Sequence, residues 1–501
     1  VKNHPAGSFA SGAVFNTFTV RGIRLEAGSR LLTFAGIQNG GDSATAIDDV
    51  RVTYAASGSL PSGTALTLTG GTLRLDVAQS VGSLAGDSGA QIINNVALTV
   101  GDVADTTFAG LISGTGALVK TASGTLTLSG ANNYTGLTNI YAGTLVAANH
   151  TALGVGGFSG DTMTFIRDGA TLALQGGISL DEHFHVWGSG VGGLGAVRSI
   201  SGHNALTSSY LGGAGYNLRS STTVGVDADS LTVSGFYEDG SSVSLTKVGA
   251  GTLTLTAPST YTGGTMINGG TLVSGAGGVG KGAVSLASGA TLSTTSASST
   301  GLAALYYNHS VNQANIASLP ALLNHFGANI TAPSLVQTAR SMNFAGNGSG
   351  FPAPYNSAAA NFEAFYSGKV NITTAGTYTF NTSSDDGSML FIDGQAVVTN
   401  NFDQAVTTRT GSIALTAGMH DIVIAYNQGG GGYGMNAQIS GAGNTTMVDI
   451  NTSNANITPD LVVGSLAGAG NVALTTGNLI TGIDNSSTSF AGVISGIGSS
   501  L

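Results

Sequence analysis

Two stretches of the chain repeat each other without a gap. Lys120–Val146 aligns with Lys247–Val273, and about 15 of 27 positions are identical, far more than chance allows for a repeat unit. A second pair of segments, 81–118 and 463–501, shares the patterns VGSLAG and FAG-x-ISG-x-G. These repeated segments are therefore predicted to form similar structural units that stack on one another. Because the late segment resumes the early pattern, whatever lies between residues 300 and 460 is predicted to be an insertion into one continuous stack.

Each repeat contains a short strand-like pattern, GTLTLSG. Leu126 and Leu128 alternate with Thr125 and Thr127, which places leucines on one side of a strand and threonines on the other. Glycine and asparagine at the ends of the pattern permit sharp corners. Strands this short bury a core only when coil stacks on coil. The pattern favours a right-handed parallel β-helix; a β-sandwich of short strands is the alternative.

The composition excludes several classes of function. Only 8% of residues are charged and the net charge is −10, with lysines and arginines scattered singly, so no basic footprint for a nucleic acid is present. The absence of cysteine excludes disulfides, thiolate zinc sites and cysteine catalysis. Hydrophobic residues make up 42% of the chain and alternate with polar ones, which argues against disorder despite 79 glycines.

The repeat unit resembles the autotransporter-associated β-strand repeat, on the residues GTLTLSGANNYTG and AGTLV. This resemblance implies a bacterial surface passenger, exported through an outer-membrane barrel outside these residues, which would be its one link to a membrane. No apolar run is long enough for a transmembrane helix. The chain begins at Val1 and ends within a strand-like pattern. We interpret it as an internal fragment of a longer protein.

The first 57 residues have a different sequence pattern from the repeats. Three strand-sized runs alternate apolar and polar positions, with turn residues between them. The segment resembles the closing strands of a jelly-roll-like sandwich, with the residues IDDV beginning the last strand. Residues 1–57 are therefore predicted to be the C-terminal part of such a domain.

Aromatic residues concentrate between about residues 300 and 440. Their alternation along several long runs predicts a sandwich with its own core, and a helix is expected near 316–326. The segments GLAALYYN, AGTYTFNTSSDDGSMLFIDG and LTAGMHDIVIAYNQGGGGYGMNAQI resemble the PA-14 domain. The fold is thus predicted to be all-β. The predicted domains are 1–57 (jelly-roll-like part), 58–298 (β-helix), 299–445 (PA-14-type sandwich) and 446–501 (resumed β-helix).

In the sugar-binding PA-14 domains, two adjacent aspartates, often joined by a cis peptide bond, hold a calcium ion. The resemblance assigns this role to Asp385 and Asp386, with the amide of Asn427 and carbonyls of Gly429 and Gly431 completing the site. The chemistry agrees, because Ca²⁺ takes six to eight oxygen ligands and prefers carboxylates, amides and carbonyls. Glycines let a loop aim its carbonyls at one point. The alternative is a plain hairpin turn, for which Asp-Gly is a strong signal.

Other polar and aromatic residues are weaker site candidates. Asp393 lies in FIDG and is predicted to be a structural turn residue. His183 and His185 share one face of a strand; a metal is possible, but without a third ligand exposed coil positions are favoured. Tyr433 is a candidate carbohydrate-binding residue together with Asp385, Asp386 and Asn427, and packing of the loop is its equal alternative.

No catalytic motif is present, so the chain is predicted not to be an enzyme. The function predicted is that of a cell-surface adhesin, whose β-helical stalk displays a calcium-dependent binding site for glycans or surface polysaccharide. One alternative is a purely structural spacer without ligand. The other is a non-catalytic targeting part of a surface polysaccharide-degrading enzyme.

Overall fold

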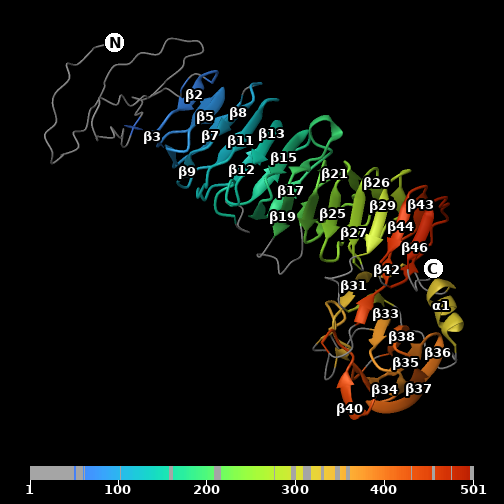
Figure 1. The fold of residues 1–501 in the computed structure, drawn as a ribbon. Helices are drawn as coiled ribbons and strands as arrows, with labels where there is room; N and C mark the ends of the chain where they lie inside the picture. The colour runs from blue at the N-terminus through green and yellow to red at the C-terminus, as the bar shows by residue number, and fades with distance from the viewer. Residues whose placement is uncertain are drawn as a thin grey trace, which may run out of the picture.

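A computed structural model of the chain shows two bodies built almost entirely from strands (Figure 1). Within the described part, the helical segments are η1 (Val191–Gly193) and α1 (Leu319–Ala328), and α1 lies close to the predicted helix. No helix in that part is long and apolar enough to cross a bilayer. The structure describes residues 50–51, 60, 62–101, 103–156, 162–207, 216–275, 277–294, 301–308, 318–328, 332–344, 350–356, 361–429, 431–453, 457–475 and 477–496.

The first body is a solenoid in which every described strand pair is parallel. Its twelve-stranded sheet, in chain order, contains β2 (Ala65–Leu68), β5 (Ser83–Gly86), β8 (Thr106–Phe108), β11 (Thr125–Leu128), β13 (Gly143–Ala147), β15 (Ala170–Gln175), β18 (Val197–Ser201), β21 (Thr222–Val226), β24 (Leu245–Val248), β26 (Thr265–Ile267), β28 (Val284–Leu286) and β43 (Leu466–Gly468). The β4–β23 sheet contains β4 (Gln79–Val81), β7 (Leu98–Val100), β10 (Leu118–Lys120), β12 (Thr138–Ile140), β14 (Thr164–Ile166), β17 (Phe184–Val186), β20 (Tyr216–Leu218) and β23 (Phe236–Glu238).

Shorter sheets complete the coils. The β16–β46 sheet contains β16 (Ser179–Asp181), β19 (His203–Thr207), β22 (Ser230–Val233), β25 (Thr252–Leu255), β27 (Thr271–Ser274), β29 (Thr291–Thr294), β44 (Asn471–Leu474) and β46 (Val493–Gly496). The remaining parallel strands are β1 (Val50–Arg51), β3 (Gly71–Leu75), β6 (Ala90–Asn94) and β9 (Leu111–Ser113) in one sheet, and β42 (Leu461–Val462) with β45 (Leu479–Ile480) in a pair.

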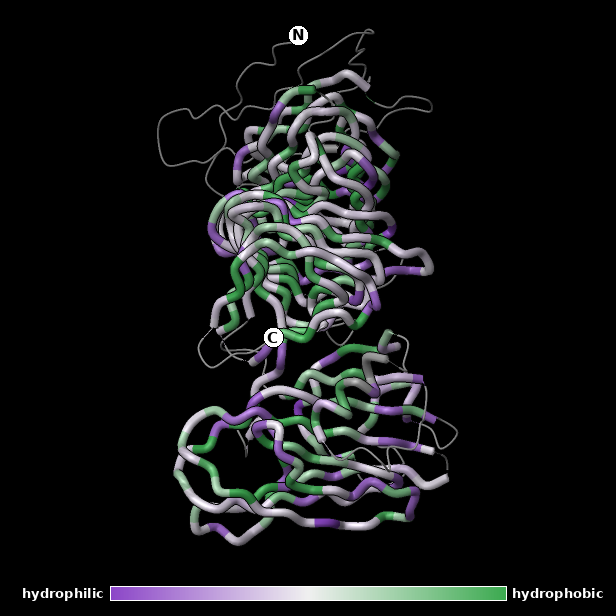
Figure 2. The backbone as a smooth tube through the Cα atoms, turned by 90° about the vertical axis from the view of Figure 1, so that its right-hand side faces the viewer, coloured by the Kyte–Doolittle hydropathy of each residue, from purple (hydrophilic) through white to green (hydrophobic). Residues whose placement is uncertain are grey.

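The alternation predicted for the repeats is present in the structure. In β11 the side chains of Leu126 and Leu128 are buried, whereas Thr125 and Thr127 are half-buried. β11 pairs in parallel with β8 and β13, and β25, its counterpart in the second repeat, pairs in parallel with β22 and β27. Hydrophobic residues accordingly run through the interior of the stacked coils (Figure 2). The prediction of a parallel β-helix is confirmed.

Both repeats also hold a buried lysine, which the sequence patterns did not single out. Lys120 and Lys247 are 2% and 0% exposed. The Nζ of Lys247 donates hydrogen bonds to the carbonyls of Val248, Gly249 and Gly269 at 2.8–3.0 Å, and Lys120 bonds equivalently to three carbonyls of its own coils. Burial lowers the pKa of Lys247 to about 8. Each lysine therefore joins the carbonyls of two successive coils.

The late segment returns to the same stack. β43 pairs in parallel with β28, and β44 pairs with β29, although the partners are far apart in the sequence. The hydroxyls of Thr294 and Thr475 lie 2.8 Å apart across this join. The prediction of one continuous stack interrupted by an insertion is confirmed.

The predicted jelly-roll segment lies outside the described residues except for Val50 and Arg51. These two residues form β1, which pairs in parallel with β3. They therefore extend a sheet of the solenoid, whereas the sequence placed them at the start of a sandwich strand.

The second body is an antiparallel sandwich that projects from the C-terminal end of the stack (Figure 1). One sheet, the β30 sheet, has the order β31 (Leu335–Ala339), β30 (Leu302–Tyr307), β33 (Phe362–Ile372), β38 (Gly418–Gln428), β35 (Gly387–Ile392) and β36 (Gln395–Asn400), with β41 (Ile457–Pro459) paired to β33. The other, the β34 sheet, has the order β32 (Asn343–Phe344), β39 (Gly434–Gly441), β34 (Gly376–Asp385) and β37 (Thr407–Leu415), with β40 (Asn444–Asp449) paired to β39.

The sandwich has its own aromatic core, as the sequence predicted. Tyr306, Phe362, Tyr366 and Phe380 are buried together between the two sheets, in a cluster separate from that of the solenoid. A second cluster packs the outer face of the β30 sheet against α1 and β42. Since β40 and β41 still pair with the sandwich, the sandwich continues beyond the predicted boundary at residue 445.

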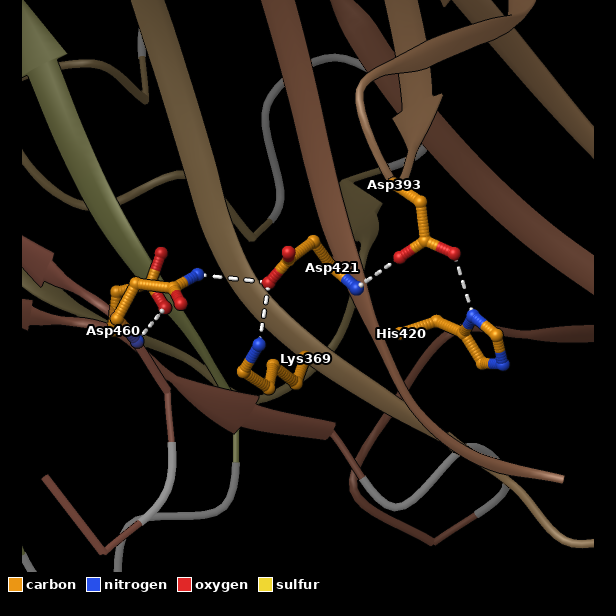
Figure 3. A network of polar contacts seen from close by, with 6 residues as sticks. Lys369, Asp393, His420, Asp421 and Asp460 are labelled. Carbon is orange, nitrogen blue, oxygen red and sulfur yellow. Dashed lines mark hydrogen bonds and ion pairs between the residues drawn. The ribbon is translucent and has the colours of Figure 1, made fainter. Parts of the chain in front are cut away.

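A polar network joins the sandwich to the resumed coils (Figure 3). The Nζ of Lys369 lies 2.7 Å from Oδ1 of Asp421, and the same oxygen accepts a hydrogen bond of 2.8 Å from the amide of Asn478 in the solenoid. The backbone N–H of Asn478 donates to Asp460, whose pKa burial raises to about 6. The network extends along the β30 sheet to Asp393, which accepts from the N–H of Asp421.

His420 at the end of this network is expected to make stability depend on pH. Its Nδ1 lies 2.6 Å from Oδ2 of Asp393 and its Nε2 lies 2.9 Å from the carbonyl oxygen of Thr416, so both nitrogens face acceptors. Burial lowers the pKa of His420, but these hydrogen bonds and the charges of Asp393 and Asp421 outweigh it and raise the pKa above its usual range. The stabilisation is thus complete below the unfolded pKa, about 6.5, and is lost as pH rises through the folded value.

His420→Gln should therefore destabilise the sandwich more at pH 5.5 than at pH 8.5. Denaturant unfolding of wild type and variant at both pH values measures this, and Asp393→Asn should flatten the same dependence. An equal loss of stability at both pH values would show that the ring acts by packing alone.

Candidate functional site

The two adjacent aspartates lie where β34 passes into β35. β34 ends at Asp385 and β35 begins at Gly387, and the peptide bond between Asp385 and Asp386 is cis. Asp385 pairs with Gly434 across the β34 sheet, while Gly387 pairs with Asn427 across the β30 sheet. The turn thus bridges the two sheets and brings the aspartates beside both ends of the glycine-rich loop 428–434.

The side chain of Asp386 binds backbone groups of two loops. Its Oδ2 accepts a hydrogen bond of 2.8 Å from the N–H of Gly429, and its Oδ1 accepts one of 3.2 Å from the N–H of Gln404. Asp386 is only 8% exposed. The carboxylate is therefore held in place by the backbone of both loops, with lone pairs left on each oxygen.

The hydroxyl of Tyr426 holds the backbone of Asp385 in place. This hydroxyl lies 2.6 Å from the carbonyl oxygen of Asp385 and 2.7 Å from Oε1 of Gln428, and it accepts from the N–H of Gly434 at 3.2 Å. The amide of Gln428 in turn donates to the carbonyl of Gly432 at 3.0 Å. Tyr426, Gln404 and Gln428 are thus site residues that the sequence analysis missed. The signal for Tyr426 was weak, because an aromatic residue at a core position usually indicates packing.

The electrostatics of the site favour a cation. Burial and the charge of Asp386 together raise the pKa of the Asp385 carboxyl. A Cβ added at Gly432 would lie 2.6 Å from Oδ2 of Asp385, so this carboxylate rests against the glycine loop. Two adjacent carboxylates that repel each other are stabilised by a positive ion between or beside them.

The residue types at this turn are those that calcium prefers, and calcium binding itself stays a prediction. The structure brings Asp385, Asp386 and Asn427 to one end of the sandwich, together with Gly429. The observed contact of Gly429 is through its N–H, so carbonyl ligation by Gly429 and Gly431 stays a prediction. Among the described residues no group of three or more His, Asp or Glu side chains could hold a metal. An ion here would therefore depend on amide and backbone oxygens besides the two carboxylates.

Tyr433 packs into the sandwich, which favours the alternative to sugar binding. The residue is 6% exposed, and its ring stacks near Phe351 with centroids 6.4 Å apart. A buried ring presents no free face to a ligand. The assignment of Tyr433 as a carbohydrate-binding residue is therefore corrected: it anchors the glycine loop to the core.

The prediction that His183 and His185 are exposed is wrong. They are 1% and 8% exposed, because Arg219 and Tyr237 from later coils pack over them. Asp393, in contrast, occupies a two-residue turn between β35 and β36 with φ of 48°. It binds His420 and the N–H of Asp421, which is the structural role predicted for it.

The sandwich also has a hollow of about 420 Å³ away from the aspartates. Its walls come from β34, β37, β39 and β40 and are mostly hydroxyl and amide side chains, including Thr377, Asn381 and Asn444. None of the predicted site residues lines it.

Family comparisons agree with the two resemblances noted in the sequence. The PA14 domain model matches residues 298–447. The passenger-associated-transport-repeat model matches residues 118–147 and 245–273, which are the two repeated segments. The chain therefore carries a PA14 domain inserted into a solenoid that contains two passenger-associated repeats, and the predicted resemblance to an autotransporter passenger is confirmed.

A curated relative is the adhesin BmaC autotransporter of Brucella suis biovar 1 (strain 1330), which is 37% identical over 180 residues. The match covers 35% of this chain and 4% of the relative. Solved structures similar to this chain include the PA14 sugar-binding domain from an RTX adhesin (22% identity, 31% of this chain, 98% of that chain, TM-score 0.26). Another is the PA14 domain of the antifreeze protein MpAFP (21% identity, 32% of this chain, 90% of that chain, TM-score 0.26).

Proposed function

We propose that this chain is a non-enzymatic part of a bacterial cell-surface adhesin, associated with the outer membrane in the full-length protein, and that its PA14 domain binds glycans through calcium. The contact that carries the proposal is the hydrogen bond from the N–H of Gly429 to Asp386, which holds one carboxylate of the pair against the glycine loop. The PA14 match and the adhesin relative support the same assignment.

The chemistry of such a site follows from its donors. Asp385, Asp386 and Asn427 would supply oxygen ligands from the protein side, and calcium supplies a positive centre with open coordination positions. Vicinal sugar hydroxyls are neutral oxygen ligands that suit those positions. Tyr426 and Gln404 would hold the aspartates and have no direct contact with the sugar.

A glycan array probed with the whole chain tests the proposal. In millimolar calcium we expect binding to a subset of glycans, and we expect a chelator to abolish it. Asp386→Asn should behave as the chelated wild type, whereas Asp393→Asn, the same change at the neighbouring turn, should still bind. Glycan binding that persists unchanged both in chelator and in Asp386→Asn would refute a role for calcium. If the wild type binds no glycan in calcium, the structural spacer is the better description.

A further inference from the structure

The outward face of the β4–β23 sheet changes character along the solenoid. One row of residues, each paired with the next across neighbouring strands, runs along this face. In the early coils the row consists of small or polar side chains or valine: Ser80, Thr99, Val119 and Asn139. In the later coils the same row continues with Phe165, His185, Asn217 and Tyr237. Tyr141, Arg167 and Trp187 follow two positions further along their coils. We call Tyr141, Phe165, Arg167, His185, Trp187 and Tyr237 the aromatic patch.

Arg167 lies at the centre of the aromatic patch. Its guanidinium carbon is 4.7 Å from the ring centroid of Trp187, 4.9 Å from that of Phe165 and 5.5 Å from that of Tyr141. The ring of His185 is 5.1 Å from Phe165 and 6.3 Å from Trp187. Tyr141 is 50% exposed, so the patch reaches solvent. One cation is thus stacked among several aromatic faces on the side of the stack.

Arg219 beside the patch and Arg198 on another sheet of the solenoid are neutralised, whereas Arg167 is not paired with any carboxylate in the part of the chain that the structure describes. Arg219 bonds to Asp239 at 2.5 Å and donates to Nδ1 of His185 at 3.1 Å. Arg198 pairs with Asp227 at 2.7 Å. Within the described residues, Arg167 makes one hydrogen bond, a long one of 3.5 Å to the amide oxygen of Asn139, and its Nε has no partner there.

We propose that the aromatic patch is a second binding site, specific for an acidic polysaccharide. Sugar rings would lie on the exposed ring of Tyr141 and on the half-buried rings of Phe165, Trp187 and Tyr237, whereas the buried His185 would only support them. A uronate carboxylate would bind the guanidinium of Arg167, whose planar fork matches that group. Successive coils are spaced by about 4.8 Å, close to the length of one pyranose unit, so a chain along the axis meets one coil per sugar.

A single unpaired arginine suits a ligand with sparse charges. A nucleic acid carries a phosphate at every sugar and requires a cluster of basic residues, whereas this chain has a net charge of −10. A polysaccharide with a uronate in some of its sugars presents widely spaced carboxylates and many apolar C–H faces. In the aromatic patch, Arg167 is the counterpart of the carboxylates and the aromatic rings are the counterparts of the C–H faces.

The chain contains one tryptophan, Trp187, so intrinsic tryptophan fluorescence reports directly from the aromatic patch. The whole chain is titrated with oligosaccharides of hyaluronate, polygalacturonate and alginate, and with dextran as the neutral control. All titrations contain EDTA, so the proposed calcium site cannot contribute, and each proposal can fail without the other. We expect a saturable change of emission with at least one polyuronate and none with dextran. No saturable response to any of the three, or an equal response to dextran, would overturn the proposal.

Substitutions locate the binding. Arg167→Gln is expected to weaken polyuronate binding at least about tenfold, because it removes a charge-assisted hydrogen-bond pair. Arg74→Gln removes the same charge from β3, where Arg74 pairs with Asp76, and should leave binding unchanged. Tyr141→Ala removes an exposed ring without opening the core and should weaken binding too. Equal losses in Arg167→Gln and Arg74→Gln would indicate non-specific charge attraction, and full binding by both Arg167→Gln and Tyr141→Ala would refute the site.

Discussion

In millimolar calcium the sandwich is expected to unfold at a higher temperature than in chelator, and Asp386→Asn is expected to remove this difference. Without an ion, the charges of Asp385 and Asp386 repel, and the pKa of Asp385 is raised by burial and by Asp386. A ligand that binds only the folded state stabilises it by mass action, by about 2.7 kcal/mol at a hundred times its Kd. Differential scanning calorimetry of the whole chain measures the effect, since the two bodies have separate cores.

The variant is chosen so that it still folds. Asn keeps the shape of Asp386 but loses one of the two oxygens that accept from Gly429 and Gln404, a cost of about 1 kcal/mol in chelator. Asp393→Asn is the matched control and should retain the full calcium shift. If calcium leaves the melting of the wild type unchanged, the aspartates form only a turn.

Gly116→Ala is expected to destabilise the solenoid by about 3 kcal/mol, at the upper end of the cost of overpacking. A Cβ at Gly116 would overlap the carbonyl oxygen of Val96 in the preceding coil, while the N–H of Gly116 is bonded to the carbonyl of Asn94. Backbone atoms of a stacked coil cannot move aside without breaking the ladder that joins the coils. The loss should appear in denaturant unfolding of the solenoid transition.

Gly89→Ala provides the control for this change. A Cβ at Gly89 would meet nothing within 4 Å, and its φ lies outside the left-handed region. Its effect on stability is expected to stay within about 1 kcal/mol. Similar losses at both positions would show that loss of glycine flexibility, and not coil contact, sets the cost.

The repeats made the architecture of the solenoid predictable. A period of two in GTLTLSG determines which side chains enter the core, and its recurrence determines that coils stack in parallel. The return of VGSLAG after residue 460 likewise predicted that the stack resumes there, and the partner strand, β28, comes from the structure. These properties depend on local or repeated patterns, so they can be predicted from the sequence of a single chain.

The contents of the insertion were predictable to a lesser degree. The aromatic runs predicted a sandwich, and the motif around Asp385 and Asp386 indicated the turn that carries the candidate site. For Tyr433 the sequence allows both sugar binding and packing of the loop, because a sequence does not show whether an aromatic ring near a loop is covered by other residues. Phe351, far away in the sequence, covers it.

Periodicity, repetition and adjacent residues were sufficient to predict the class of fold, the point of insertion and the acidic turn. The tertiary structure was needed to show which side chains from different coils and strands meet. It buried His183 and His185 under Tyr237 and Arg219, joined Asp386 to the N–H groups of Gly429 and Gln404, and gathered Arg167 among aromatic rings. Such contacts link residues about 20 or more positions apart, and their geometry exists only once the backbone has closed the coils and paired the sheets.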